Sequence, residues 1–310
     1  MTTSTPLAPI DHEDGDDRPE RQPGPGGPPA AAVVVGVDGS ECGLGAVRWA
    51  AQEAARRNAP LRIVHAVPAP RRRHEADAAP TDAPHVRRIS AQAYTVAKHT
   101  EPGVRASTEV LPGDAATVLL AAASEGQLVV LGKSTTGAAD EWVLAPVAVR
   151  VSARSRRPVV LVPRARGPVD TDRPVAAVLG FGDPEDDDRV AEFAAEAAQR
   201  AGAGLTVVQI RDPRSRSSDN WTEHESEWQR RFPGIEVRRT DLPSATAGQV
   251  LSSTCPAPLI VLSAGHRSLL HRELDGPHRW LLRHCTSPLA LVPPVHRPEL
   301  EPCEEIIAVG

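Results

Sequence analysis

The stretch that decides the fold is Val33-Val34-Val35-Gly36-Val37-Asp38-Gly39-Ser40. A run of valines is typical of a strand buried on both faces of a parallel sheet, and Asp38 stands where this strand ends. Gly39 lets the chain turn, and Ser40 can cap the helix that follows. Ligands of open α/β sheets bind at the carboxyl ends of the strands, so the Asp38 carboxylate is placed to meet one.

Alternating strand and helix patterns follow this octet. Apolar residues spaced three and four apart predict a helix after Ser40, with Leu44, Val47, Ala51 and Ala54 on its buried face. The patterns predict further strands at 61–67, 104–111, 128–131 and 158–162, and helices at about 85–99 and from Asp114. The polar, proline-rich stretch 68–84 is predicted to be a mobile loop.

The whole series then recurs, which is the main fact of the chain's organisation. Three strand segments correspond in pattern to three later ones: 61–65 to 205–209, 128–131 to 259–262, and 157–163 to 287–293. The opening helix recurs with Val190, Phe193, Ala197 and Ala201. Strands that alternate with helices imply parallel sheets with right-handed crossovers. We therefore predict two α/β domains in tandem.

Composition sets the domain boundaries that we expect. The prediction is a disordered tail at 1–31, a first domain at 32–164, a linker at 165–173, a second domain at 174–294 and a tail at 295–310. The aromatic content of 3% predicts cores of Val, Leu, Ile and Ala, and 310 residues suffice for two such cores.

Charge and apolar patterning restrict the partners. The formal charge of −5 argues against nucleic acid as the main partner. Because no apolar stretch approaches the roughly 20 residues of a membrane helix, and the amino-terminal segment has no apolar signal core, we expect no membrane partner and a cytoplasmic location. The four cysteines lack CxxC spacing, which indicates reduced thiols and neither a zinc site nor a redox pair; they are Cys42, Cys255, Cys285 and Cys303.

Four segments together resemble the universal stress protein family, in its tandem two-domain form. They are Gly36-Val37-Asp38-Gly39-Ser40, the strand-end His65, Leu111-Pro112-Gly113-Asp114-Ala115, and Leu128-Val129-Val130-Leu131-Gly132. The resemblance implies two Rossmann-like domains, each a five-stranded parallel sheet of order 3-2-1-4-5 with helices on both faces. This order puts the ends of the first and fourth strands side by side, so Asp38 and Gly132 would face one cleft.

The resemblance also implies an ATP site in the first domain, with Mg²⁺ as a candidate companion of the phosphates. In nucleotide-binding members the residue matching Asp38 contacts the nucleotide, the position of Ala66 meets adenine, and the loop after the fourth strand wraps the phosphates. The candidate binding residues are Val37, Asp38, Gly39, Ser40, Ala66, Leu131, Gly132, Lys133, Gly137 and Val147.

The phosphate loop departs from the family pattern at two places. Thr135 stands where a second glycine is expected, and the closing Gly-Ser pair falls on Ala145-Pro146. Proline has no N–H for a phosphate oxygen, and the alanine methyl hinders close approach, although Gly137 can partly compensate. Losing one or two charge-assisted hydrogen bonds, at about 1.5–3 kcal/mol each, predicts weak nucleotide binding. The alternative is an interaction module with an empty ancestral cleft.

The second domain departs further. Aligning the two opening helices puts Gly182 at the place of Asp38, while Gln209 replaces His65 and Ser263 replaces Gly132. Asp275 falls near the phosphate position, where its charge would repel the ligand. We therefore predict that the second domain binds no ATP and has a structural or regulatory role.

Other motifs add little chemistry. Gly132-Lys133-Ser134 is not a Walker A loop, because Gln127 stands where the first glycine is needed; Lys133 is either a point charge for phosphate or an exposed surface lysine. The histidines of residues 266–284 alternate with arginines, which favours a solvated basic loop over a metal site. No catalytic motif is present, so we expect no enzyme, or slow ATP hydrolysis at most.

The predicted fifth strands, Val159 to Val162 and Leu289 to Val292, are apolar edges that need cover. In the family such strands pair across a dimer axis. The two are expected to pair with each other within one chain, or with a second copy in a homodimer. The function predicted from the sequence is thus that of a cytoplasmic stress-response or regulatory protein.

Overall fold

The computed structural model describes residues 31–69, 83–133, 135–136, 143–144, 146–164, 173–180, 184–210, 226, 228–242, 246–265 and 276–294. The predicted tail at 295–310, all but the last residue of the tail at 1–31, nearly all of the predicted linker and most of the predicted loop at 68–84 lie outside these residues. The domain boundaries therefore stay predictions, and the two parts are called here the first half (residues 31–164) and the second half (residues 173–294).

Five parallel strands form the sheet of the first half. They are β1 (Ala32–Gly36), β2 (Leu61–Val67), β3 (Ala106–Pro112), β4 (Gly126–Lys133) and β7 (Val159–Pro163). Their order is β3-β2-β1-β4-β7, and every neighbouring pair is parallel. This is the predicted order 3-2-1-4-5. A short antiparallel pair, β5 (Thr135–Thr136) and β6 (Val143–Leu144), lies between β4 and the next helix.

Four helices cover the two faces of this sheet. The helix α1 (Glu41–Arg56) and the helix α2 (Pro84–Thr100) share one buried cluster with the strands. The opposite face is covered by α3 (Ala115–Glu125) and α4 (Pro146–Arg154). All four apolar residues predicted for the first helix are buried in its cluster. The predicted cap at Ser40 is confirmed, since its side chain accepts a backbone N–H at the start of α1, and Asp114 caps α3 in the same way.

The second half repeats the arrangement. Its strands are β8 (Val175–Leu179), β9 (Leu205–Ile210), β10 (Val237–Leu242), β11 (Ile260–Ser263) and β12 (Leu289–Val292), in the order β10-β9-β8-β11-β12. The described helices are α5 (Pro184–Ala201), α7 (Ala247–Thr254) and α8 (Gly276–His284). The same order of elements and the same strand order confirm the predicted repeat.

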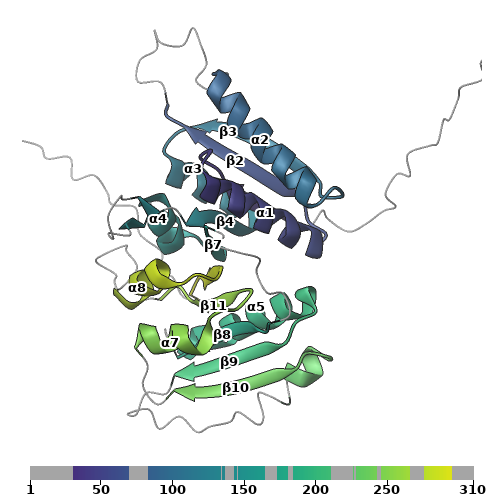
Figure 1. Ribbon diagram of the computed structural model, residues 1–310, viewed down its shortest axis with the longest axis vertical. Helices are drawn as coiled ribbons and strands as arrows, with labels where there is room; N and C mark the ends of the chain where they lie inside the picture. Colours follow the sequence, from purple (N-terminus) through teal and green to yellow (C-terminus); the bar gives the residue numbers. More distant parts are fainter. Residues whose placement is uncertain are drawn as a thin grey trace, which may run out of the picture.

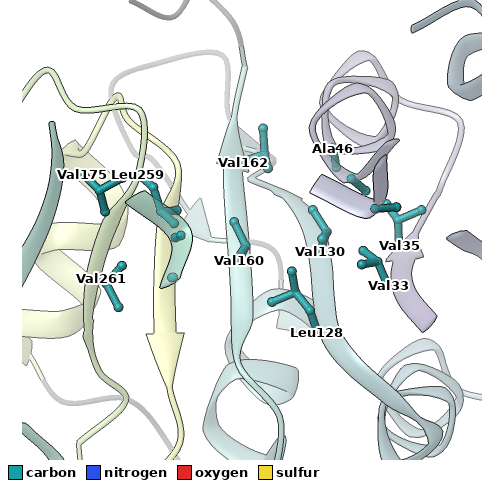
Figure 2. Close-up of a cluster of buried hydrophobic side chains, with 14 of the residues drawn as sticks. Val33, Val35, Ala46, Leu128, Val130, Val160, Val162, Val175, Leu259 and Val261 are labelled. Carbon is teal, nitrogen blue, oxygen red and sulfur yellow. The ribbon is translucent and has the colours of Figure 1, made fainter. Parts of the chain in front are cut away.

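The two five-stranded sheets join into one sheet of ten strands. Strand β7 pairs antiparallel with β12, with Leu161 opposite Leu289 and Val160 opposite Ala290. Figure 1 shows the halves stacked on each other around this junction. Figure 2 shows Val160 and Val162 of β7 between side chains of the first half and side chains of the second, all of which belong to one buried cluster. Each half therefore covers the fifth strand of the other.

Candidate functional site

The ends of β1 and β4 lie side by side at the point where the chain changes direction. Gly36 of β1 stands opposite Leu131 of β4 in the parallel register. After β1 the chain enters α1 on one face of the sheet, whereas after β4 it reaches α4 on the other face. Such a topological switch point is where open α/β sheets place ligands, because the two connections leave in opposite directions.

Asp38 is fixed at this edge by Ser40. Its Oδ1 atom accepts hydrogen bonds from the backbone N–H of Ser40 at 2.9 Å and from the Ser40 hydroxyl at 2.6 Å. The Ser40 oxygen in turn accepts the N–H of Gly43 at 3.1 Å and so caps α1. Asp38 is exposed, and its Oδ2 atom accepts no hydrogen bond from the described residues. The carboxylate is therefore both oriented and accessible.

Gly132, the last residue but one of β4, lies against the backbone of α1. A Cβ atom on Gly132 would lie 2.5 Å from the carbonyl carbon and oxygen of Cys42 and 2.8 Å from the nitrogen of Gly43. The glycine is thus required for the packing of the strand on the first turn of the helix, whatever it does for a ligand. Gly39 is required by its backbone, since its φ is +81°.

Lys133 ends β4 at this edge, but its side chain points away from the ends of β1 and β4, contrary to both sequence-based interpretations. Its side chain is only 6% exposed, and its Nζ atom donates hydrogen bonds to the carbonyl oxygens of Cys285 at 2.6 Å and Arg283 at 3.4 Å. Successive residues of a strand face opposite sides, so Gly132 meets α1 while Lys133 points to the opposite face. Burial lowers the pKa of this ammonium group, and the carbonyls at the end of α8 offer it partial negative charge. Lys133 is therefore neither an exposed lysine nor a charge at the strand ends.

The remaining candidate residues lie near the carboxyl ends of the strands of the first half. Val37 is buried, and its carbonyl accepts a hydrogen bond of 2.8 Å from Nδ1 of His65. Leu131 is buried in the cluster under α3 and α4, where Ala66 and Val147 pack partly buried. These three apolar side chains share one face of the sheet. Gly137 lies outside the described residues.

Three comparisons identify the relatives of this chain. Residues 31–163 match the model of the universal stress protein family. The universal stress protein Rv1996 of Mycobacterium tuberculosis is 28% identical over 275 residues, which cover 76% of this chain and 86% of the relative. The universal stress protein Rv2624c of the same organism is 23% identical over 279 residues, which cover 87% of this chain and 98% of the relative.

Residues 31–163 belong to the universal stress protein family, and the chain is similar to universal stress proteins along most of its length. A solved structure supports the fold along most of its length. The crystal structure of a universal stress protein from Archaeoglobus fulgidus DSM 4304 has a TM-score of 0.64 at 17% identity, covering 84% of this chain and 97% of that one.

In the second half of the chain, carboxylates of the chain itself occupy the corresponding edge. The strand register pairs Val33 with Leu61 and Val175 with Leu205, so Gly180, and not the Gly182 of the helix-based alignment, takes the place of Asp38. The alignment was wrong because the turn before α5 differs in length from the turn before α1. Gly180 has a φ of +76° and donates its N–H to Oδ1 and Oδ2 of Asp187, at 2.9 and 3.0 Å.

A second carboxylate lies beside the end of β11. The hydroxyl of Ser263, the residue that replaces Gly132, donates to Oδ2 of Asp186 at 2.9 Å, and both side chains are buried. Burial raises the pKa of the neighbouring Asp187 to about 6, with smaller contributions from Asp186 and Asp188. Sequence analysis missed these groups, although three consecutive aspartates at a helix start are a recognisable signal. The predicted repulsion by Asp275 falls on a residue outside the described ranges.

Proposed function

We propose that this protein is a regulatory protein of the stress response whose first half binds ATP or another adenine nucleotide with low affinity. The observation that carries the proposal is Asp38: an accessible carboxylate, held by two hydrogen bonds from Ser40, at the switch point between β1 and β4. A fixed carboxylate can accept hydrogen bonds from the hydroxyl groups of a ribose without the entropy cost of ordering a mobile side chain.

The surroundings of Asp38 fit a nucleoside better than a triphosphate. The partly buried Ala66 and Val147 supply small apolar surface on one face, which suits a base. The phosphates gain less, because Lys133 is engaged with α8 and Pro146 has no N–H to donate. Mg²⁺ would accompany the phosphates when ATP binds. This imbalance supports weak binding in which adenosine contributes more than the phosphate chain.

The second half is proposed to have a structural or regulatory role without a nucleotide. Asp186 and Asp187 already accept hydrogen bonds from Ser263 at the end of β11 and from Gly180 directly after β8. Two carboxylates at this edge would also repel a phosphate.

We propose that 32–164 and 174–294 are the two domains and that the junction of β7 with β12 makes them a pseudo-dimer within one chain. We also propose a cytoplasmic location. No helix among the described residues is long and apolar enough to cross a membrane.

Calorimetric titration of the full chain with ATP, AMP and adenosine tests the nucleotide site. We expect the three ligands to bind with similar affinity, and Asp38→Ala to weaken each by about tenfold or more, the effect of losing a hydrogen bond to a charged group. Asp188→Ala is the matched control, because it removes an exposed aspartate from the first turn of α5 and should leave binding unchanged. Equal affinities of the wild type and Asp38→Ala would refute the site.

A second candidate function is an interaction module that binds no nucleotide. Two observations favour it. The close packing of Gly132 on α1 and the capping of α1 by Ser40 explain these two residues without a ligand. The same titration separates the two functions: absence of heat with all three ligands, for a chain that unfolds cooperatively, supports the interaction module and rejects nucleotide binding.

A further inference from the structure

Two cysteines of the second half meet although they are far apart in the sequence. Cys255 is the C-cap of α7, and Cys285 follows the last residue of α8. The two helices pack against each other on one face of the sheet, as Figure 1 shows. This brings the Sγ atoms to 4.0 Å, and both thiols are free. The spacing in the sequence gave no indication of a pair.

The surroundings give the two thiols different chemistry. Cys255 is partly exposed, whereas Cys285 is 2% exposed and its Sγ donates to the carbonyl oxygen of Ser287 at 3.3 Å. The Ser287 hydroxyl accepts the N–H of Ala257 at 3.1 Å, which leaves its own proton for Cys255 Sγ at 3.8 Å. The contact with Cys285 and the hydrogen bond with Ser287 lower the pKa of the Cys255 thiol, whereas the contact with Cys255 and burial raise the pKa of Cys285. Cys255 is thus the more nucleophilic sulfur.

We propose that Cys255 and Cys285 are a reversible thiol–disulfide pair that is oxidised by hydroperoxides. In the first step the Cys255 thiolate attacks the peroxide oxygen, the O–O bond breaks, and the products are a sulfenic acid and, after protonation, water or an alcohol. In the second step Cys285 attacks the Cys255 sulfur, the S–O bond breaks, and the Cys285 proton leaves with the hydroxide as water. Two electrons pass from the two thiols to the peroxide, and a dithiol reductant reverses the change.

The geometry requires only a short movement to make the bond. An S–S bond is about 2.05 Å long, so the sulfurs must approach by about 2 Å. Cys285 is the fixed partner, because its sulfur is buried and its carbonyl oxygen is held by Lys133 of the first half. Cys255 lies beyond the last turn of α7 and is the partner that can turn toward it. Cys255 is thus the accessible sulfur that reacts with the oxidant, and Cys285 is the buried sulfur that attacks the resulting sulfenic acid.

Mass spectrometry of the full-length chain tests the pair. The reduced protein is treated with one equivalent of hydrogen peroxide, free thiols are alkylated, and the chain is digested without reductant. We expect a peptide pair linked through Cys255 and Cys285, lost again after a dithiol reductant. In the untreated protein Cys255 should react with iodoacetamide at least about tenfold faster than Cys285. Peroxide-treated protein in which both cysteines are still alkylated would overturn the proposal.

Single variants assign the two roles. In Cys285→Ser, peroxide should leave Cys255 as a sulfenic acid that dimedone traps; Cys285→Ala repeats the measurement if the serine variant does not fold. In Cys255→Ser, Cys285 should stay reduced. Cys42→Ser is the matched control and should retain the link, because Cys42 lies on α1 in the other half. Oxidation of Cys285 in the absence of Cys255, or loss of the link in the control, would contradict the assignment.

Discussion

Gly132 is the residue at which the packing of the candidate site is most constrained. Gly132→Ala would place a methyl carbon 2.5 Å from backbone atoms of Cys42, which cannot rotate away. We expect this variant to lower the free energy of unfolding by about 1–3 kcal/mol. Gly45→Ala is the control, because nothing lies within 4 Å of its Cβ position in α1, and it should raise stability by about 0.5–1 kcal/mol. Urea unfolding measures both; a Gly132→Ala variant as stable as the wild type would contradict the packing.

Single residues also mark the limit of prediction from the sequence. The positions of Asp38 and Gly132 followed from strand order, because parallel strands bring their carboxyl ends to one edge. The orientation of Lys133 did not follow, since its partner Cys285 is 152 residues away and belongs to the other half. The pairing of Cys255 with Cys285 depends in the same way on how α7 and α8 pack. Local patterns carry no information on such contacts.

At the scale of elements, strands and helices followed from hydrophobic period, whereas the turns between them did not. The apolar helix faces have a period that only a helix satisfies, whereas the valine-rich runs are identified as strands by their short length and β-branched side chains. The turn from β8 to α5 differs from the turn from β1 to α1, so matching the helices shifted the alignment by two residues, from Gly180 to Gly182. The aspartates at the start of α5 consequently received no role from the sequence.

The first turn of α5 makes the stability of the protein depend on pH. Burial raises the pKa of Asp187 from 3.8 to about 6. Between these values the folded protein holds a proton that the unfolded chain has released, so the free energy of unfolding falls as pH rises through this window. Asp187→Asn cannot ionise, and we expect it to exceed the wild type in stability by about 1–3 kcal/mol at pH 7.5, with the difference largely gone near pH 4.

Unfolding in urea at the two pH values measures this effect. The control is Asp188→Asn, which alters the exposed neighbouring carboxylate and should reduce the pH dependence only slightly, because Asp188 raises the pKa of Asp187 less than burial does. A difference between Asp187→Asn and the wild type that is the same at both pH values would show that the charge of Asp187 is not the cause.

At the scale of the molecule, the repeat predicted two sheets, but the charged contacts that join them could not be predicted. Glu53 of α1 is 5% exposed and lies 2.6 Å from Nε of Arg57 and 3.6 Å from Nε of Arg200 on α5. The Arg57 guanidinium also lies over the ring of Phe193, 5.5 Å from its centre. A glutamate in an alanine-rich helix is usually solvated, and only the approach of α5 makes this one a contact between the halves.

Glu53 should therefore stabilise the contact between the two halves, which we expect to unfold together. The continuous core and the junction of β7 with β12 predict a single calorimetric transition for the wild type, with equal calorimetric and van't Hoff enthalpies. Glu53→Ala leaves the Arg57 and Arg200 side chains without their shared carboxylate, which we expect to cost about 3–5 kcal/mol. The exposed ion pair of Glu236 with Arg238 gives the control, because Glu236→Ala should cost less than about 1 kcal/mol. Two separate transitions in the wild type would mean that the halves are stable independently and that the shared core does not couple them. Equal losses of stability in the two variants would mean that the Glu53 contact does not contribute to this coupling.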